Sequence, residues 1–220
     1  MNILIISAHP DDETIGMGGT LSKLSSRGHS LSWLIVTRAF TPKWDARYIT
    51  AKKKEIKKVG SYYGFRKVIN AKFKAASLSS YPQLEIADTI SNAVKSTRAE
   101  VIYTPPLFDC HLDHEIVTGN VLSVVRPWNG SEVKQIISYE IPVTTNFSEI
   151  KSNKQVFNYF ENISLNFKNK LEVMSFYKSE LKEYPHPRSL KGLTILASER
   201  GLRSGYKYAE VFSILYARND

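Results

Sequence analysis

Short apolar runs alternate with longer segments of helical periodicity along the whole chain. The runs predict strands at residues 3–6, 31–36, 68–69, 101–103, 135–139 and 158–163. The periodic segments predict helices at residues 20–27, 46–63, 84–97, 116–125, 165–181 and 193–200. Continuous apolar strands alternating with helices are typical of a parallel sheet that is covered on both faces. The pattern therefore predicts a single-domain α/β fold over residues 1–220, a doubly wound, mostly parallel, Rossmann-like sheet.

The first predicted strand runs directly into a cluster of ionisable residues. After the apolar run at 3–6 the chain continues Ser-Ala-His-Pro-Asp-Asp-Glu, which includes His9, Asp11 and Asp12. In open α/β sheets, ligands bind in the crevice beyond the carboxyl ends of the strands. Two aspartates before a helix are often only a helix cap. The neighbouring histidine favours a metal site instead, because imidazole and carboxylate are both zinc ligands.

A second cluster of the same kind follows the predicted strand at 101–103. Residues 109–114 read Asp-Cys-His-Leu-Asp-His and hold two of the five histidines of the chain. If the two clusters converge, the smallest complete ligand set is His9, Asp12 and His114. Three protein ligands and a water in the fourth position form the open arrangement of a catalytic zinc site.

Together the clusters resemble the motifs of the PIG-L/LmbE-like deacetylases, metal-dependent enzymes that remove N-acyl groups from N-acetylglucosamine-type sugars. The likeness rests on Ala-His-Pro-Asp-Asp-Glu at 8–13 and Asp-x-His-x-Asp-His at 109–114. It extends through 18–21, Glu55, Gly64, 186–189, 200–201 and 208–210, so it covers nearly the whole chain. The resemblance implies an LmbE-like α/β fold and deacetylase activity.

Carried over position by position, the resemblance also implies three metal ligands and three catalytic residues. The ligands are His9, Asp12 and His114, the general base is Asp11, and His111 is the acid or oxyanion stabiliser, oriented by Asp113. We expect one zinc ion per chain, with another divalent metal such as Fe²⁺ as the alternative.

Amide hydrolysis explains why such residues are needed. An amide is a poor electrophile, and zinc both polarises the carbonyl and lowers the pKa of a bound water to about 7. Asp11 could take the second proton of that water and deliver it to the leaving amine. A protonated His111 would stabilise the charge that collects on the former carbonyl oxygen. Asp113, hydrogen-bonded to the far nitrogen of His111, would keep that ring charged.

Three basic residues are the candidates for substrate binding. Where the family often has an arginine three residues ahead of the helix glutamate, this chain has Lys52, with Arg47 as a stand-in. Arg188 follows a histidine flanked by two prolines, and its guanidinium suits a phosphate or carboxylate. We therefore expect Arg47, Lys52 and Arg188 to contact the substrate.

The formal net charge of +9 admits other partners. The lysines at 52–54 and 57–58 could form a nucleic-acid patch, but in a helix they spread over several faces, as on a solvated helix. We favour that solvated face over attraction of an acidic substrate, and expect no nucleic-acid partner.

Composition agrees with a compact enzyme. The chain is 42% hydrophobic, and it has no apolar run of about 18 residues that would predict a transmembrane segment. The N-terminal apolar run ends at His9, before a signal-peptide pattern develops. A single cysteine, Cys110, excludes an internal disulfide framework. We expect a cytoplasmic protein, either monomer or oligomer.

The sequence therefore favours zinc-dependent hydrolysis of the N-acetyl amide of an N-acetylglucosamine-type sugar, with a conjugated or anionic glycan precursor as the candidate substrate. Acetate and a free amine would be the products. Two alternatives stay open. A metal-dependent phosphoesterase normally gathers enough carboxylates for two metals. A non-catalytic sugar-binding relative would have lost Asp11 or a metal ligand, and none is missing here.

Overall fold

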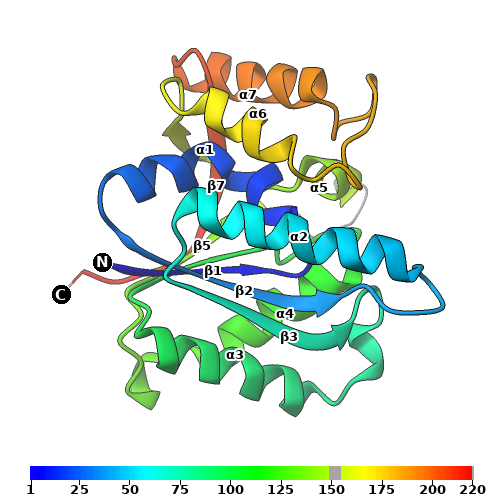
Figure 1. The fold of residues 1–220 in the computed structure, drawn as a ribbon. Coiled ribbons are helices and arrows are strands. Elements are labelled where there is room, and N and C mark those ends of the chain that lie inside the picture. Colours follow the sequence, from blue (N-terminus) through cyan, green and yellow to red (C-terminus); the bar gives the residue numbers. More distant parts are fainter. Residues whose placement is uncertain (149–154, 220) are drawn as a thin grey trace.

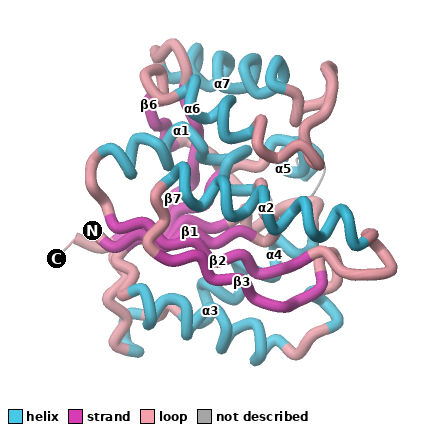
Figure 2. The backbone as a smooth tube through the Cα atoms, in the orientation of Figure 1, coloured by secondary structure: helices cyan, strands magenta, loops and turns pink. Residues whose placement is uncertain are grey.

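A seven-stranded sheet in the order β3-β2-β1-β4-β5-β7-β6 forms the centre of the molecule (Figures 1 and 2). The computed structural model describes residues 1–148 and 155–219. Its strands are β1 (Asn2–Ser7), β2 (Ser30–Arg38), β3 (Lys67–Lys74), β4 (Val101–Thr104), β5 (Gln135–Tyr139), β6 (Tyr159–Asn162) and β7 (Ala209–Ala217). β1 to β5 pair in parallel, and β7 runs antiparallel to both β5 and β6. The predicted mostly parallel sheet is confirmed.

Helices cover both faces of the sheet (Figure 1). On one face lie α1 (Asp12–Ser26), α2 (Ala46–Tyr63), α6 (Phe167–Met174) and α7 (Leu190–Ser204), and on the other lie α3 (Gln83–Thr97) and α4 (Leu112–Val124). The short α5 (Pro142–Ser148) follows β5, and 3₁₀ turns span Leu78–Ser80 and Pro127–Asn129. No helix in the described part of the chain is long and apolar enough to cross a membrane.

Strand β1 shows why this sheet needs two layers of helices. Its alternate residues Ile3 and Ile5 belong to one buried cluster, while Leu4 and Ile6 belong to the cluster on the opposite face. All four side chains are at most 2% exposed. The continuous apolar run thus encodes a strand that is buried on both sides.

Helix α1 begins at Asp12, well before the predicted start at residue 20. Its glycines serve close packing, because a Cβ at Gly16 would lie 2.4 Å from the Tyr139 ring and one at Gly19 would lie 2.7 Å from Ile163. The helix has a kink at Met17, and the carboxylate of Glu210 accepts hydrogen bonds from the backbone N–H groups of residues 19 and 20 just beyond it.

Other elements differ from their predicted bounds. Helix α4 begins at Leu112 rather than at residue 116, so Asp113 and His114 lie in its first turn. Helix α6 ends at Met174, short of the predicted residue 181. Strand β7 was not predicted at all, although it lies between β5 and β6 in the sheet and pairs with both. The helix Ala46–Tyr63 and the strand Gln135–Tyr139 have the predicted bounds.

Candidate active site

The two ionisable clusters meet between β1 and β4, where the order of the strands in the sheet reverses. β1 and β4 are adjacent and parallel, with Ile5 opposite Tyr103. From β1 the chain continues to β2 on one side, whereas β4 is followed by β5 on the other. Such a switch point opens a crevice at the carboxyl ends of the two strands. The ring centroid of His111 lies 4.5 Å from that of His9 and 4.7 Å from that of His114.

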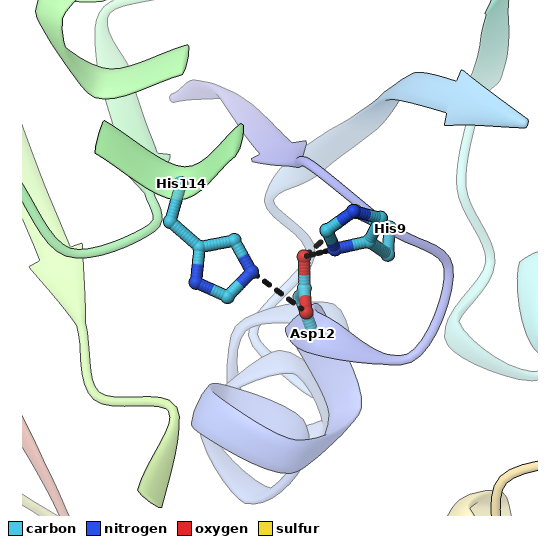
Figure 3. Close-up of side chains that lie close together, drawn as sticks. All are labelled: His9, Asp12 and His114. Atoms are coloured by element: carbon cyan, nitrogen blue, oxygen red, sulfur yellow. Dashed lines mark hydrogen bonds and ion pairs between the residues drawn. The ribbon is translucent and has the colours of Figure 1, made fainter. Parts of the chain in front are cut away.

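The proposed metal ligands surround one small space, with Asp12 between the two imidazoles (Figure 3). Asp12 Oδ2 lies 3.6 Å from His9 Nδ1, and Asp12 Oδ1 lies 3.6 Å from His114 Nε2. A ligand atom from each of the three residues lies within 4.8 Å of the others. A second set with the same property consists of His9, His111 and Asp113. Because both sets use His9, they cannot be filled independently.

The donor atoms of this set suit a cation. His114 is 2% exposed, and its Nε2 is a buried atom without a hydrogen-bond partner. Leaving a buried polar atom unsatisfied costs about 1 to 3 kcal/mol. A divalent ion held by His9, Asp12 and His114 would supply the missing partner, and nitrogen and carboxylate oxygen are suitable ligands for zinc. The residues present therefore fit a metal ion.

Asp109, to which the sequence analysis gave no role, lies behind His114. Its Oδ2 is 3.5 Å from His114 Nδ1 and accepts a hydrogen bond from Thr144 Oγ1 at 2.9 Å. Burial raises the pKa of Asp109, but the nearby His114 together with the hydrogen bonds from the His111 backbone and Thr144 outweighs burial and lowers the pKa. A carboxylate behind a metal-ligating histidine fixes the orientation and tautomer of its ring. Asp109 is the first residue of the Asp-x-His-x-Asp-His motif, but only this tertiary contact indicates its role.

Asp11 has an unusual backbone and a buried carboxylate that lies 3.6 Å from the guanidinium of Arg188. It precedes α1 with φ +130° and ψ −25°, a conformation that residues other than glycine rarely adopt. The residue is 5% exposed, and its Oδ2 has no hydrogen-bond partner. Burial first, and then the charge of Asp12, raises the pKa of Asp11 to about 8, against the opposing charge of Arg188. The carboxyl of Asp11 thus takes up and releases its proton at a pH near neutral.

The resemblance implied a hydrogen bond from the Asp113 carboxylate to the far nitrogen of His111. In the structure this carboxylate has other partners. Its Oδ2 lies 3.0 Å from His9 Nε2 and accepts the Ala76 N–H at 2.6 Å, while Oδ1 accepts the Leu78 N–H at 3.1 Å. The backbone N–H of Asp113 donates to His111 Nδ1 at 3.2 Å instead. The carboxylate of Asp113 is thus contacted by the side chain of His9 and by two backbone N–H groups.

His111 is consequently a neutral ring. Burial and the charges of His9 and His114 lower the pKa of His111 to about 4, so the expectation of a charged imidazolium is not met. Because Nδ1 accepts the backbone hydrogen bond, Nε2 carries the proton. His111 can therefore donate a hydrogen bond without being charged.

The residues expected to bind substrate divide into two groups. Lys52 and Arg188 line a cavity of about 270 Å³, which is also lined by His9, Asp11, Asp12, His111 and His114. Arg47, exposed in the first turn of α2, does not line it. The structure thus brings two of the three basic residues to the site.

Both of these cations are already paired, through a glutamate that the sequence analysis missed. Glu180 accepts hydrogen bonds from Tyr48 Oη at 2.5 Å, Lys52 Nζ at 2.8 Å and Arg188 Nη1 at 2.7 Å. Burial raises the pKa of Glu180, but the charges and hydrogen bonds of Lys52, Tyr48 and Arg188 together outweigh burial and lower the pKa. Glu180 belongs to none of the motifs found in the sequence. The wall of the cavity is a polar network and not a set of free positive charges.

Comparisons with known proteins agree with this arrangement. The PIG-L family model, GlcNAc-PI de-N-acetylase, matches residues 4–125, a span that contains both clusters. None of the curated proteins matches the sequence.

Several solved structures share the fold. N,N'-diacetylchitobiose deacetylase from Pyrococcus horikoshii is 19% identical with a TM-score of 0.72, and the match covers 97% of this chain and 83% of that one. The zinc-inhibited form of teicoplanin deacetylase Orf2 is 14% identical, with a TM-score of 0.75 and full coverage of both chains. GalB, the 4-carboxy-2-hydroxymuconate hydratase from Pseudomonas putida KT2440, is 14% identical with a TM-score of 0.74, covering 100% of this chain and 98% of that one.

At these identities the neighbours establish the fold, and the hydratase among them shows that one fold can carry more than one chemistry. The family model is more specific, because it spans more than half of the chain. This chain therefore belongs to the PIG-L family.

Proposed function

We propose that the protein is a metal-dependent N-deacetylase that hydrolyses the N-acetyl amide of an N-acetylglucosamine-type sugar, releasing acetate and a free amine. One observation carries the proposal: Asp11, a buried carboxylate with one oxygen that has no hydrogen-bond partner, lines the same cavity as a complete His/Asp/His ligand set. The family, and two neighbours that are deacetylases, support it.

His9, Asp12 and His114 would hold the metal, which we propose is zinc, with Fe²⁺ as the alternative. When bound there, such an ion polarises the amide carbonyl and acidifies a water. Asp113 holds the far nitrogen of His9, and Asp109 lies at the far nitrogen of His114. Two carboxylates thus orient the two imidazole ligands, an arrangement that strengthens metal binding.

Asp11 is the proposed general base. Its Oδ2 has no hydrogen-bond partner and can accept the proton that the attacking water loses. Burial raises the pKa of this carboxyl, so it binds a proton more strongly than an exposed aspartate, and the charge of Arg188 at 3.6 Å opposes this rise. Protonated Asp11 can then return the proton to the nitrogen of the leaving amine.

His111 is the proposed oxyanion stabiliser. In its neutral form the Nε2–H donates a hydrogen bond toward the oxygen on which negative charge develops, and preorganised donors of this kind contribute strongly to catalysis. Its Nδ1 is held by the Asp113 backbone, which fixes the ring. This is one of the two roles expected from the sequence, and it needs no charged ring.

The cavity matches the size of one sugar unit. Its volume of about 270 Å³ lies at the lower end of the range of small-molecule sites. Trp44 and Tyr48 line it, and their stacked rings offer an apolar surface to a sugar ring. Lys52 and Arg188, held by Glu180, supply donors for hydroxyl groups of the sugar.

Acetate release from a panel of acetylated sugars tests the proposal. Protein loaded with zinc is incubated with N-acetylglucosamine, N,N'-diacetylchitobiose and N-acetylglucosamine 1-phosphate, and acetate is quantified enzymatically. Asp11→Asn, with its metal content measured alongside, is the matched control. Acetate release that is lost in Asp11→Asn would support the proposal, and no acetate from any sugar would contradict it. Hydrolysis of 4-nitrophenyl phosphate instead would favour the phosphoesterase.

A further inference from the structure

A groove of about 820 Å³ lies beside the catalytic cavity, between helix α2 and the segments β2 and β3. Four residues, Pro10, Thr37, Ala39 and Lys52, line both spaces. The groove and the catalytic cavity are therefore neighbours that share one wall. The groove has the volume of a typical small-molecule site, whereas the catalytic cavity has room for little more than a sugar.

One face of α2 forms a side of this groove. Its residues there are Ile49, Lys52, Lys53, Ile56, Lys57 and Gly60, which follow the spacing of a single helical stripe. Lys53 and Lys57, four residues apart, thus point to the same groove, although the sequence analysis treated them as part of a solvated face. Lys54 is also exposed on α2 but does not line the groove.

Four positive charges surround the groove without carboxylate partners. Arg38 and Lys72 come from the strands, opposite Lys53 and Lys57 from the helix. None of the four forms an ion pair in the described part of the chain. No aspartate or glutamate among the residues at 1–148 and 155–219 lines the groove. This contrasts with the catalytic cavity, where Glu180 neutralises Lys52.

The lining between these charges is apolar. Ile56, Phe65 and Val68 are partly buried and pack against the core, leaving one side of each to the groove. At Gly60 the helix comes close to β3, since a Cβ there would lie 3.2 Å from Val68 Cγ2. Gly60 is two helical turns, about 12 Å, beyond Lys52 at the catalytic cavity. The helix and the strand are thus in close contact at this end of the groove.

We propose that this groove binds the aglycone of the substrate, and that the aglycone is an apolar group bearing an acidic substituent. The inference rests on the proposed deacetylase function, which places the acetylated sugar in the adjoining cavity. The apolar floor takes the body of the aglycone, and the four cations take its negative charge. Recognition of the anion is thereby assigned to Arg38, Lys53, Lys57 and Lys72, rather than to the paired Lys52 and Arg188.

A fluorescent probe without an amide tests the groove independently of deacetylation. Binding of 2-naphthyl phosphate to the metal-loaded protein is compared with binding of 2-naphthol and of inorganic phosphate. We expect the naphthyl phosphate to bind more tightly than either. Lys57→Glu should weaken its binding about fivefold, the scale expected for reversing an exposed charge, and Ser61→Phe, which adds bulk at an exposed groove position, should weaken it too. Lys54→Glu is the matched control and should have no effect.

Equal losses in Lys57→Glu and Lys54→Glu would overturn the proposal, because the probe would then respond to general surface charge or to the metal. Equal binding of all three probes would overturn it as well. The link to catalysis is tested by acetate release from N-acetylglucosamine and from its naphthyl phosphodiester. We expect the diester to have the higher kcat/KM, with the advantage reduced in Lys57→Glu. No acetate from either compound, with probe binding intact, would contradict the proposed function alone.

Discussion

The guanidinium of Arg188 lies 3.6 Å from the buried carboxylate of Asp11. Its charge lowers the pKa of Asp11, opposing burial and Asp12, which raise it. Asp11 must be unprotonated to accept a proton, so kcat/KM falls as the pH drops through this pKa. Arg188→Ala should raise the pKa and move the acidic limb of the pH profile of kcat/KM to higher pH. Arg188→Lys keeps the charge and should move it less; an unchanged limb in Arg188→Ala would mean that Asp11 is not the group that titrates.

Glu180 should act in the opposite sense. Its negative charge raises the pKa of Asp11, so Glu180→Gln should lower that pKa and move the acidic limb to lower pH. The same variant loosens Lys52 and Arg188, so KM should rise while the limb shifts. The check is a full pH profile of both variants. Shifts of Arg188→Ala and Glu180→Gln in the same direction would show that the changes act by disturbing the fold.

Metal content should separate Asp11 from its neighbour Asp12. Asp12→Ala and His114→Ala should lose the metal, whereas Asp11→Asn should keep it and lose roughly 100-fold or more in kcat, as expected for a general base. Asp109→Asn should weaken metal binding about 10- to 100-fold without removing a ligand. Elemental analysis with acetate release measures both effects. Equal metal loss in Asp11→Asn and Asp12→Ala would refute the separation of roles.

Two glycines should respond in opposite ways to the same substitution. A Cβ at Gly19 would lie 2.7 Å from Ile163, whereas none of the described atoms lies within 4 Å of a Cβ at Gly119, which is exposed on α4. Gly19→Ala should cost about 1 to 3 kcal/mol of unfolding free energy through overpacking. Gly119→Ala should gain about 0.4 to 1 kcal/mol, because it restricts the unfolded chain. Urea unfolding curves measure both, and a loss in Gly119→Ala equal to that in Gly19→Ala would contradict this account of the packing.

The positions of the two clusters could be predicted because each follows a short apolar strand. Strand ends are visible in sequence, and parallel strands bring their carboxyl ends to one edge of the sheet. His9, Asp12 and His114 are therefore found together, as expected.

The hydrogen bonds behind these residues could not be predicted. The carboxylate of Asp113 binds His9, which is remote in sequence, and Glu180 reaches α2 across the fold. Such contacts depend on how helices and loops pack, for which no local pattern exists. β7 was missed as a strand although its first half is buried. The cytoplasmic location, the oligomeric state and the single domain over residues 1–220 stay predictions.

The backbone conformation of Asp11 lowers the stability of the fold, whereas its side chain is needed for the proposed activity. At φ +130° an aspartate is strained by about 1 to 3 kcal/mol, which a glycine would avoid. Selection for stability alone would therefore replace Asp11 by glycine. The strained aspartate is kept only while catalytic activity is also selected. Laboratory evolution toward heat resistance, without a screen for activity, should drift to glycine at this position and yield a sturdier but inert protein.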